Sequence, residues 1–423
     1  MPNYKRKKRS RFSAKPKTDK TRYAEREEKK NTAEVNNDEK PKKKSGFNIL
    51  KGKKAVWKRR WKKIAAALLV IVASLIICDA VLPAGLYETV LTMLRASGSG
   101  SYPITLETSN TENVVVKSNF YYVLTNSEVK AVTTGGKVIF TYTHGFENPV
   151  IKTSSTRALV FNQGGNNALI FNLDEVCSTI ETEKEIKTAA IAEDGTYAIV
   201  TGADGYVAAV NVYEKDDTPL YRWFSSNDMV NNVGLSPNGE KLAVTTFSTN
   251  VGGFNSKLLI LNYNSATPEF TKDYNGEIVY NLSTAYSDGL AVVTANNFNF
   301  INWSEYELKQ YKNEYNLQMM RECDGGILLV YNRENDKTDN RIVIISDEGE
   351  IIKEFEFSGI ITDISYEDDV VYCISDTKAY ILNLSGKIVR NTDCGFGVVR
   401  FAVISQDEIA VITDNSINKV KFE

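Results

Sequence analysis

The fold is decided by a short turn-and-strand sequence near the middle of the chain, SPNGEKLAV at Ser236–Val244. Its Asn238-Gly239 dipeptide is typical of tight β-hairpins, because both residue types accept the positive φ that such turns require. The residues over Lys241–Thr246, rich in apolar and β-branched types, favour an extended strand. The stretch therefore predicts an antiparallel hairpin whose second strand starts at Lys241.

This hairpin belongs to a repeat that runs through most of the chain. Short strands rich in β-branched and aromatic residues alternate with Asn, Asp, Gly and Ser from about residue 102 onward. The equivalent second strands are Phe120–Leu124, Ala158–Phe161, Tyr197–Thr201, Lys241–Thr246, Leu290–Thr294, Ile327–Tyr331, Val370–Ile374 and Glu408–Thr413. Equivalent positions are 37 to 48 residues apart, the period of four-stranded propeller blades. The sequence therefore predicts an all-β fold, a β-propeller of four-stranded antiparallel blades, with eight blades favoured and seven as the alternative.

The turn before the second strand carries glycine in several units. Gly195, Gly239 and Gly289 each follow an Asp or Asn, and Gly325-Gly326 hold the same place in another unit. We expect positive φ at these glycines, because tight hairpin turns require it.

The last repeat unit is incomplete, since it contains only three strands, near Val398–Ile404, Glu408–Thr413 and Asn418–Phe422. Its fourth strand is expected from the start of the domain, at Tyr102–Leu106. Such a pairing closes the ring and removes an exposed sheet edge, which open β-structures must otherwise protect. The propeller domain is thus expected to span residues 102–423.

An apolar stretch before the propeller predicts a transmembrane helix. Residues 64–82 form a run of 19, about 28 Å of helix against the roughly 30 Å hydrocarbon core of a bilayer. The predicted membrane-interface residues are Trp57, Lys58, Arg59, Arg60, Trp61, Lys62 and Lys63. Their basic charges predict a cytoplasmic amino terminus, and hence a single-pass protein of the cell membrane with an extracellular carboxy-terminal domain. A signal peptide cleaved near Ala80 is the alternative, which the long preceding segment disfavours.

The first 63 residues differ in composition from the rest. They contain 25 Lys and Arg against 7 Asp and Glu, a net charge of +18, whereas the remainder has 26 against 46, a net charge of −20. Residues 1–63 are expected to be a disordered cytoplasmic tail, because so polar a segment buries too little apolar surface to fold. Its expected partner is the anionic headgroup layer of the lipid bilayer. Nucleic acid is disfavoured, since the basic run Lys5–Arg11 has neither interleaved aromatic residues nor a folded reader module.

A linker at residues 83–101 joins the predicted helix to the propeller. Its first part, Leu86–Leu94, is amphipathic. Ser97–Ser101 follow, and their Ser and Gly composition favours a flexible spacer.

Two features of the sequence resemble known propellers. Ser236–Val244 resembles the S-P-D-G-x-x-L-A-V hairpin of the TolB and YVTN groups, and the blade order resembles quinoprotein-like propellers. The whole plan of basic tail, single crossing, Ser/Gly spacer and propeller resembles an uncharacterised family of membrane-anchored propellers from Gram-positive, clostridia-like bacteria. That resemblance implies a fold and a topology, and it implies no activity. The Trp-Asp dipeptide of WD40 repeats and the Trp-containing docking repeats of quinone-dependent dehydrogenases are absent from the sequence.

No catalytic constellation, cofactor site or metal site is recognisable in the sequence. The single histidine, His144, ends a predicted fourth strand and is interpreted as a turn or surface residue. The cysteines of the domain are widely separated, at Cys177, Cys323, Cys373 and Cys394. Without a C-x-x-C pair or a second histidine they predict neither a zinc site nor a structural disulfide. We therefore expect no cofactor, and a binding protein rather than an enzyme.

Three groups of neighbouring aromatic residues are candidates for a binding surface, Phe120–Tyr122, Tyr221–Phe224 and Phe298–Trp303. Consecutive residues of a strand point to opposite faces, so part of each group lies away from its nearest packing layer. Packing between blades is one interpretation, and a surface that anchors a protein or stacks on a glycan is the other. The favoured function is a membrane-anchored, extracytoplasmic binding or scaffolding module for an envelope protein or polymer. The alternatives are a carbohydrate-active enzyme, a glycosidase or lyase with paired carboxylates in the propeller channel, and an extracytoplasmic sensor.

Overall fold

The computed structural model describes residues 86–423 except 107–109, 118, 251–252, 266, 285, 287, 324 and 334–335, together with 62, 65–66, 68–70 and 73–74. Contacts divide the chain into two units, Met1–Ala66 and Ala67–Glu423. Within the described residues, no helix combines the length and the apolar character needed to cross a bilayer. Most of the helix predicted at 64–82, almost all of the tail and every predicted interface residue except Lys62 lie outside the described residues.

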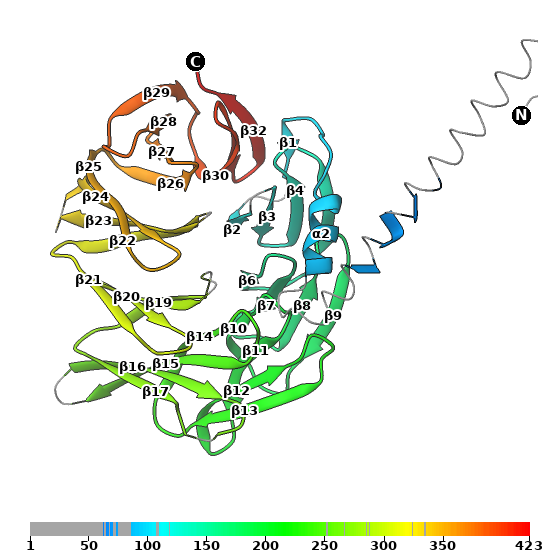
Figure 1. The fold of residues 1–423 in the computed structure, drawn as a ribbon, viewed down its shortest axis with the longest axis vertical. Helices are drawn as coiled ribbons and strands as arrows, with labels where there is room; N and C mark the ends of the chain where they lie inside the picture. The colour runs from blue at the N-terminus through cyan, green and yellow to red at the C-terminus, as the bar shows by residue number, and fades with distance from the viewer. Residues whose placement is uncertain are drawn as a thin grey trace, which may run out of the picture. The chain divides into compact units, whose positions relative to one another are not determined.

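Eight four-stranded antiparallel sheets follow one another around a ring (Figure 1). Seven of them use four consecutive strands each, so the chain completes one blade before it enters the next. The eighth sheet combines the last three strands of the chain with the first. The predicted propeller of four-stranded antiparallel blades is confirmed, with eight blades rather than seven.

The first strand of each blade is the innermost strand of the ring. This follows because the first strands of neighbouring blades contact each other at most interfaces. Blades 1 to 4 contain β2 (Thr111–Val116), β3 (Phe120–Thr125), β4 (Glu128–Thr133), β5 (Val138–Thr143), β6 (Pro149–Thr153), β7 (Ala158–Asn162), β8 (Asn167–Phe171), β9 (Val176–Glu181), β10 (Ile186–Ile191), β11 (Tyr197–Ala203), β12 (Tyr206–Tyr213), β13 (Pro219–Ser225), β14 (Met229–Leu235), β15 (Lys241–Asn250), β16 (Gly253–Asn262) and β17 (Phe270–Asn275). Blades 5 to 8 contain β18 (Val279–Ser283), β19 (Gly289–Thr294), β20 (Asn297–Asn302), β21 (Leu308–Lys312), β22 (Asn316–Cys323), β23 (Gly326–Arg333), β24 (Asp336–Ser346), β25 (Ile351–Ser358), β26 (Ile361–Glu367), β27 (Val370–Ser375), β28 (Lys378–Leu382), β29 (Ile388–Asp393), β30 (Val398–Ser405), β31 (Glu408–Thr413), β32 (Ser416–Lys421) and β1 (Ile104–Thr105).

The core consists of apolar clusters between neighbouring blades. Among the described residues there are eight such clusters, one at each interface around the ring. The eight predicted second strands are all second strands in the structure, and their side chains alternate between two of these clusters. Tyr121 packs between blades 8 and 1, for example, whereas Tyr122 packs between blades 1 and 2. Burial on both faces explains why these strands are apolar throughout.

Ring closure joins the two ends of the propeller domain. β1 pairs antiparallel with β32, and the paired residues are Ile104 with Ile417 and Thr105 with Ser416. Ile104 and Leu106 are 8% and 3% exposed and pack in the cluster between blades 8 and 1. The prediction that Tyr102–Leu106 supplies the missing strand is confirmed, although only two of its residues pair as a strand.

The turn glycines behave as predicted with one exception. Gly195, Gly239 and Gly325 have φ of +93°, +67° and +79°. Gly289 lies in strand β19 without a positive φ, so that expectation is wrong. Its glycine is required by a close approach instead, because a Cβ there would lie 2.0 Å from the ring of Phe300.

Helix α2 (Leu86–Arg95) is attached to the propeller (Figure 1). Glu88 in its first turn lies 3.2 Å from Arg157 and 3.9 Å from Lys215, which belong to turns of blades 2 and 3. Arg95 in its last turn lies 3.1 Å from Asp174 in blade 2. An acidic first turn and a basic last turn also suit the helix dipole.

The Ser/Gly segment after α2, expected as a flexible spacer, lies against the turn between β4 and β5. The N–H of Gly100 donates to the C=O of Gly135 (2.9 Å), and the Thr133 hydroxyl donates to the C=O of Gly98 (3.2 Å). A Cβ at Gly100 would lie 2.2 Å from the carbonyl oxygen of Gly136. Glycine is therefore needed here for close backbone contact with blade 1.

Candidate functional site

Two of the three aromatic groups are core residues. The aromatic members of Phe120–Tyr122 and of Phe298–Trp303 are at most 5% exposed. β3 and β20 are the second and third strands of their blades, so neighbouring blades cover both of their faces. For these two groups, packing between blades is the correct interpretation.

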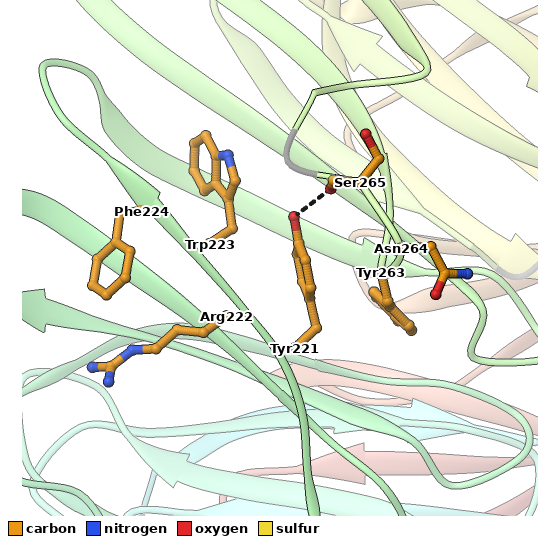
Figure 2. Close-up of a pocket in the computed structure, with 7 residues that line it drawn as sticks. All are labelled: Tyr221, Arg222, Trp223, Phe224, Tyr263, Asn264 and Ser265. Atoms are coloured by element: carbon orange, nitrogen blue, oxygen red, sulfur yellow. Dashed lines mark hydrogen bonds between the residues drawn. The ribbon is translucent and has the colours of Figure 1, made fainter.

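The third group lies on an outermost strand and lines a groove. β13 is the outer strand of blade 3, where Tyr221 and Trp223 are half-buried against the cluster between blades 3 and 4, while Arg222 and Phe224 are exposed. The groove has a volume of about 410 Å³. Its lining residues are Tyr221, Arg222, Trp223, Phe224, Tyr263, Asn264 and Ser265 (Figure 2).

The opposite wall of the groove is the turn between β16 and β17 in blade 4. The Asn262 side chain accepts a hydrogen bond from the N–H of Asn264 (2.9 Å), an arrangement typical of Asn in turns. The Tyr221 hydroxyl donates to the C=O of Ser265 (3.1 Å), and its ring centroid lies 5.2 Å from that of Tyr263 (Figure 2). These contacts fix the two walls relative to each other.

Exposed aromatic surface continues along the rim of the groove. Tyr206, at the start of β12, stacks on Phe224 with 4.5 Å between ring centroids. These two side chains are 46% and 37% exposed. The guanidinium of Arg222 lies 4.9 Å from the centroid of the Phe224 ring. Clustered exposed apolar surface marks interaction sites, whereas scattered exposed residues do not.

The groove supplies stacking surfaces and hydrogen-bonding groups without an acid–base pair. Burial raises the pKa of the Tyr221 and Tyr263 phenols, so both are neutral at pH 7. The Tyr263 hydroxyl is buried without a hydrogen-bond partner among the described residues. None of the seven lining residues is Asp, Glu, His or Cys, so the lining lacks the usual general acids and bases.

His144 has structural contacts that account for both ring nitrogens. Its Nδ1 accepts a hydrogen bond from the N–H of Phe146 (3.0 Å), and its Nε2 lies 3.1 Å from the C=O of Thr125. The neutral ring with its proton on Nε2 satisfies both contacts. Burial lowers the pKa of His144, which favours the same form. These contacts agree with a turn residue rather than a catalytic base.

The cysteines of the propeller are free thiols. Cys373 is buried in β27, and burial raises the pKa of Cys323 to about 11 and raises that of Cys177 as well. Thiols that stay protonated at neutral pH are weak nucleophiles and metal ligands.

A buried charge network joins the innermost strands of blades 6, 7 and 8. Asp363 in β26 is 1% exposed and accepts hydrogen bonds from Arg321 (2.8 Å), from Arg400 (2.7 Å) and from the N–H of Phe401 (3.0 Å). Burial raises the pKa of Asp363 to about 6, while Arg321 opposes the shift. The sequence analysis missed this network because its members lie on three different blades.

Two carboxylates of the innermost strands, Glu322 and Asp363, are engaged by neighbouring groups. Glu322 in β22 accepts a hydrogen bond from Ser283 and interacts electrostatically with Lys152 of β6. Asp363 is occupied by two guanidinium groups. A glycosidase needs two carboxyl groups about 5–10 Å apart on either side of the scissile bond. The described contacts instead pair these carboxylates with cations and a hydroxyl.

A family model described as "Family of unknown function (DUF5711)" matches residues 96–422, so the chain belongs to that family. No curated protein matches the sequence. Among solved structures, BamB from Moraxella catarrhalis is 9% identical with a TM-score of 0.48, over 77% of this chain and 99% of that one. Apo AztD from Citrobacter koseri is 9% identical with a TM-score of 0.47, over 74% and 89%. The dihydro-heme d1 dehydrogenase NirN is 11% identical with a TM-score of 0.48, over 76% and 78%. These similarities are too distant to indicate a function.

Proposed function

We propose that this member of the DUF5711 family is a membrane-anchored binding module that holds a glycan of the cell envelope in its aromatic groove. The observation that carries the proposal is a groove of about 410 Å³ lined by four aromatic side chains and no carboxylate. Such a site binds by stacking and hydrogen bonding, and it has no group suited to protonate a glycosidic oxygen. The expected behaviour is binding without turnover.

A glycan suits the groove because each sugar presents an apolar C–H face as well as hydroxyl groups. The ring of Trp223 offers rigid apolar surface to the first, and Phe224, on the opposite face of β13, extends this surface at the rim. Arg222, Asn264 and Ser265 offer donors and acceptors to the second. The lining residues come from the outermost strand of blade 3 and from the β16–β17 turn of blade 4, so the groove lies between the outer parts of two blades.

Membrane anchoring is supported by the apolar run at 64–82 and by its described residues. Leu68, Leu69 and Val70 are helical and 56%, 71% and 67% exposed. Exposed apolar side chains on a helix are costly in water and stable in the hydrocarbon of a bilayer. With a net charge of +18 in the first 63 residues, the proposal places the tail in the cytoplasm and the propeller at the outer face.

The binding proposal is tested with the full chain in lipid nanodiscs and soluble glycan strands prepared from peptidoglycan. Phe224→Ala removes exposed stacking surface, and we expect a loss of about 1 kcal/mol, roughly fivefold in affinity, by isothermal titration calorimetry. Phe396→Ala is the matched control, because Phe396 is 87% exposed and lies outside the groove. Absence of binding by the wild type, or equal binding by Phe224→Ala, would contradict the proposal. Shortened glycan products would favour the carbohydrate-active alternative.

The topology is tested separately by protease treatment of intact cells stripped of their wall. An epitope at the carboxyl terminus should be lost and one in residues 1–63 should be retained. Retention of the carboxy-terminal epitope would overturn the anchoring proposal and leave the groove proposal standing.

A further inference from the structure

Blade 8 has an unusually short outermost strand. The outermost strands of blades 1 to 7 contain five to eight residues each, whereas β1 contains two. β1 pairs only with the beginning of β32, at Ser416 and Ile417. The remaining part of β32 has no outer neighbour within the described part of the chain.

The open part of this edge can be assigned to particular backbone groups. The N–H of Phe422 donates to Asp407 (2.9 Å), so even-numbered residues of β32 direct their backbone groups toward β31. Odd-numbered residues point outward, as the bond from the N–H of Leu106 to the C=O of Asn415 shows (2.9 Å). Lys419 and Lys421 therefore present four outward backbone groups, two donors and two acceptors.

The incoming chain explains why β1 does not extend along this edge. The residues before β1 are bound to blade 1, where the Tyr102 hydroxyl donates to the C=O of Thr134 (2.9 Å). Gly100 is hydrogen-bonded to the β4–β5 turn of the same blade. The chain thus reaches blade 8 from blade 1, part of the way along β32, and leaves the rest of the edge uncovered.

The side chains around this edge are cationic and apolar. Lys419 and Lys421 are exposed on β32, and the Lys419 ammonium also lies 3.2 Å from the Glu408 carboxylate of β31. In the neighbouring blade, Ile388 and Val389 of β29 are 45% and 57% exposed. Arg390 of β29 lies 2.6 Å from Asp407, whose C=O is bonded to the end of β32, so the two blades meet here. We call the outward edge at Lys419 and Lys421, with Ile388 and Val389, the blade-8 slot.

We infer that the blade-8 slot accepts an extended acidic segment of a partner protein, which completes the fourth strand of blade 8. In the other seven blades, the third strand pairs along its length with a fourth strand of five to eight residues. An added segment of similar length would give β32 the same partner. Edge addition supplies main-chain hydrogen bonds, and side-chain pockets supply the specificity. Lysines at an edge discourage pairing with neutral or basic strands, so an acidic partner is the one they select. This site is distinct from the glycan groove and does not depend on it.

The inference is tested with the full chain and a fluorescent peptide, IIKEFEFS, the sequence of the outermost strand β25. We expect measurable binding by anisotropy, and at least tenfold weaker binding by Lys419→Pro. Proline there removes an outward N–H and spares the ladder with β31, but it also removes the Lys419 ammonium and its ion pair with Glu408 (3.2 Å). Lys419→Gln, which loses the charge and keeps the N–H, separates the two effects. A peptide with both Glu replaced by Gln should bind several-fold more weakly. Lys312→Gln, an exposed lysine on the outermost strand of blade 5, is the control and should bind as wild type does.

Two outcomes overturn the inference. Equal binding by Lys419→Pro rejects strand addition, and equal binding of the Gln peptide rejects the acidic specificity. Loss of peptide binding in Phe224→Ala alone would place the peptide in the aromatic groove and also reject the slot. If Lys419→Pro does not fold, hydrogen exchange of wild type decides: slower exchange at Lys419 and Lys421 with peptide supports the slot, and unchanged exchange refutes it.

Discussion

Asp363→Asn tests how strongly the buried charge network holds the ring together. Asp363 bridges Arg321 of β22 and Arg400 of β30, so one carboxylate connects the innermost strands of three consecutive blades. The substitution keeps the size of the side chain and removes its charge. The perturbation is therefore electrostatic and leaves no cavity.

The expected cost follows from burial. Asp363 is 1% exposed, and the side chains of Arg321 and Arg400 are 24% and 17% exposed, so water screens the three charges poorly. Removing one partner of a buried ion pair costs about 3–5 kcal/mol, because the remaining charge stays buried without compensation. Two cations remain and repel each other, which raises the cost, but the raised pKa of Asp363 shows that burial already opposes its charge, which lowers the cost, so we expect the lower end of that range. Replacing Arg321, Asp363 and Arg400 together by Met, Leu and Met should cost less than about 2 kcal/mol.

Urea unfolding followed by intrinsic fluorescence measures both variants. Asp363→Asn should lower the midpoint with an unchanged slope, and the triple apolar variant should restore most of the loss. A loss below about 1 kcal/mol for Asp363→Asn would refute the reasoning. A triple variant as unstable as Asp363→Asn would also refute it, because packing rather than charge would then be responsible.

Three further predictions concern the ring and its turns. Because burial lowers the pKa of His144 below its ordinary 6.5, the folded state resists protonation, and the His144 contribution to the free energy of unfolding should fall as the pH drops below about 6.5. The raised pKa of Asp363 contributes with the opposite sign in this range, so the measured quantity is the difference between wild type and His144→Gln in urea titrations at pH 7.5 and 5.5, which should be smaller at pH 5.5. Ile104→Ala and Leu106→Ala should each cost about 2–5 kcal/mol, seen as a lower Tm and faster proteolysis of the first strand, since both side chains are buried at the closure. Gly289→Ala should cost about 1–3 kcal/mol because its Cβ meets an aromatic ring, whereas Gly202→Ala, whose nearest neighbour is 3.8 Å away, should stay within about 0.5 kcal/mol.

The fold was predictable because a propeller repeats one local pattern. Each second strand is buried on both faces, so an apolar run such as Ile327–Tyr331 appears at the same place in every unit. The incomplete last unit then pointed to Tyr102–Leu106 as the closing strand, since only a strand from the other end could fill it. The repeated strands are thus predictable from local sequence, and the ring closure is predictable from the need to cover the exposed sheet edge of the last blade.

The groove was less predictable because the exposure of a side chain depends on whether its strand is the first, second, third or outermost strand of the blade. Phe120–Tyr122 and Tyr221–Phe224 have similar sequences, yet the first group lies on a second strand and the second on an outermost strand. The repeat does predict that Tyr221–Phe224 lie on an outermost strand, because they directly precede β14, the first strand of the next blade. The repeat does not predict the second wall of the groove, at Tyr263–Ser265, or the network around Asp363. Both depend on contacts between blades, which join residues about 40 positions apart in the sequence.

Helix α2, the aromatic groove and the blade-8 slot lie at one end of the ring. The turn between first and second strands and the turn between third and fourth strands share an end in each blade, because neighbouring strands are antiparallel. Helix α2 contacts turns of this kind through Glu88, the groove uses one at Tyr263, and the blade-8 slot opens beside one at Lys421. Only three residues separate the predicted membrane helix from α2, a reach of about 10 Å. Under the proposed anchoring, this end of the propeller lies close to the bilayer, so both ligands would have to be available near the membrane surface rather than farther out in the wall.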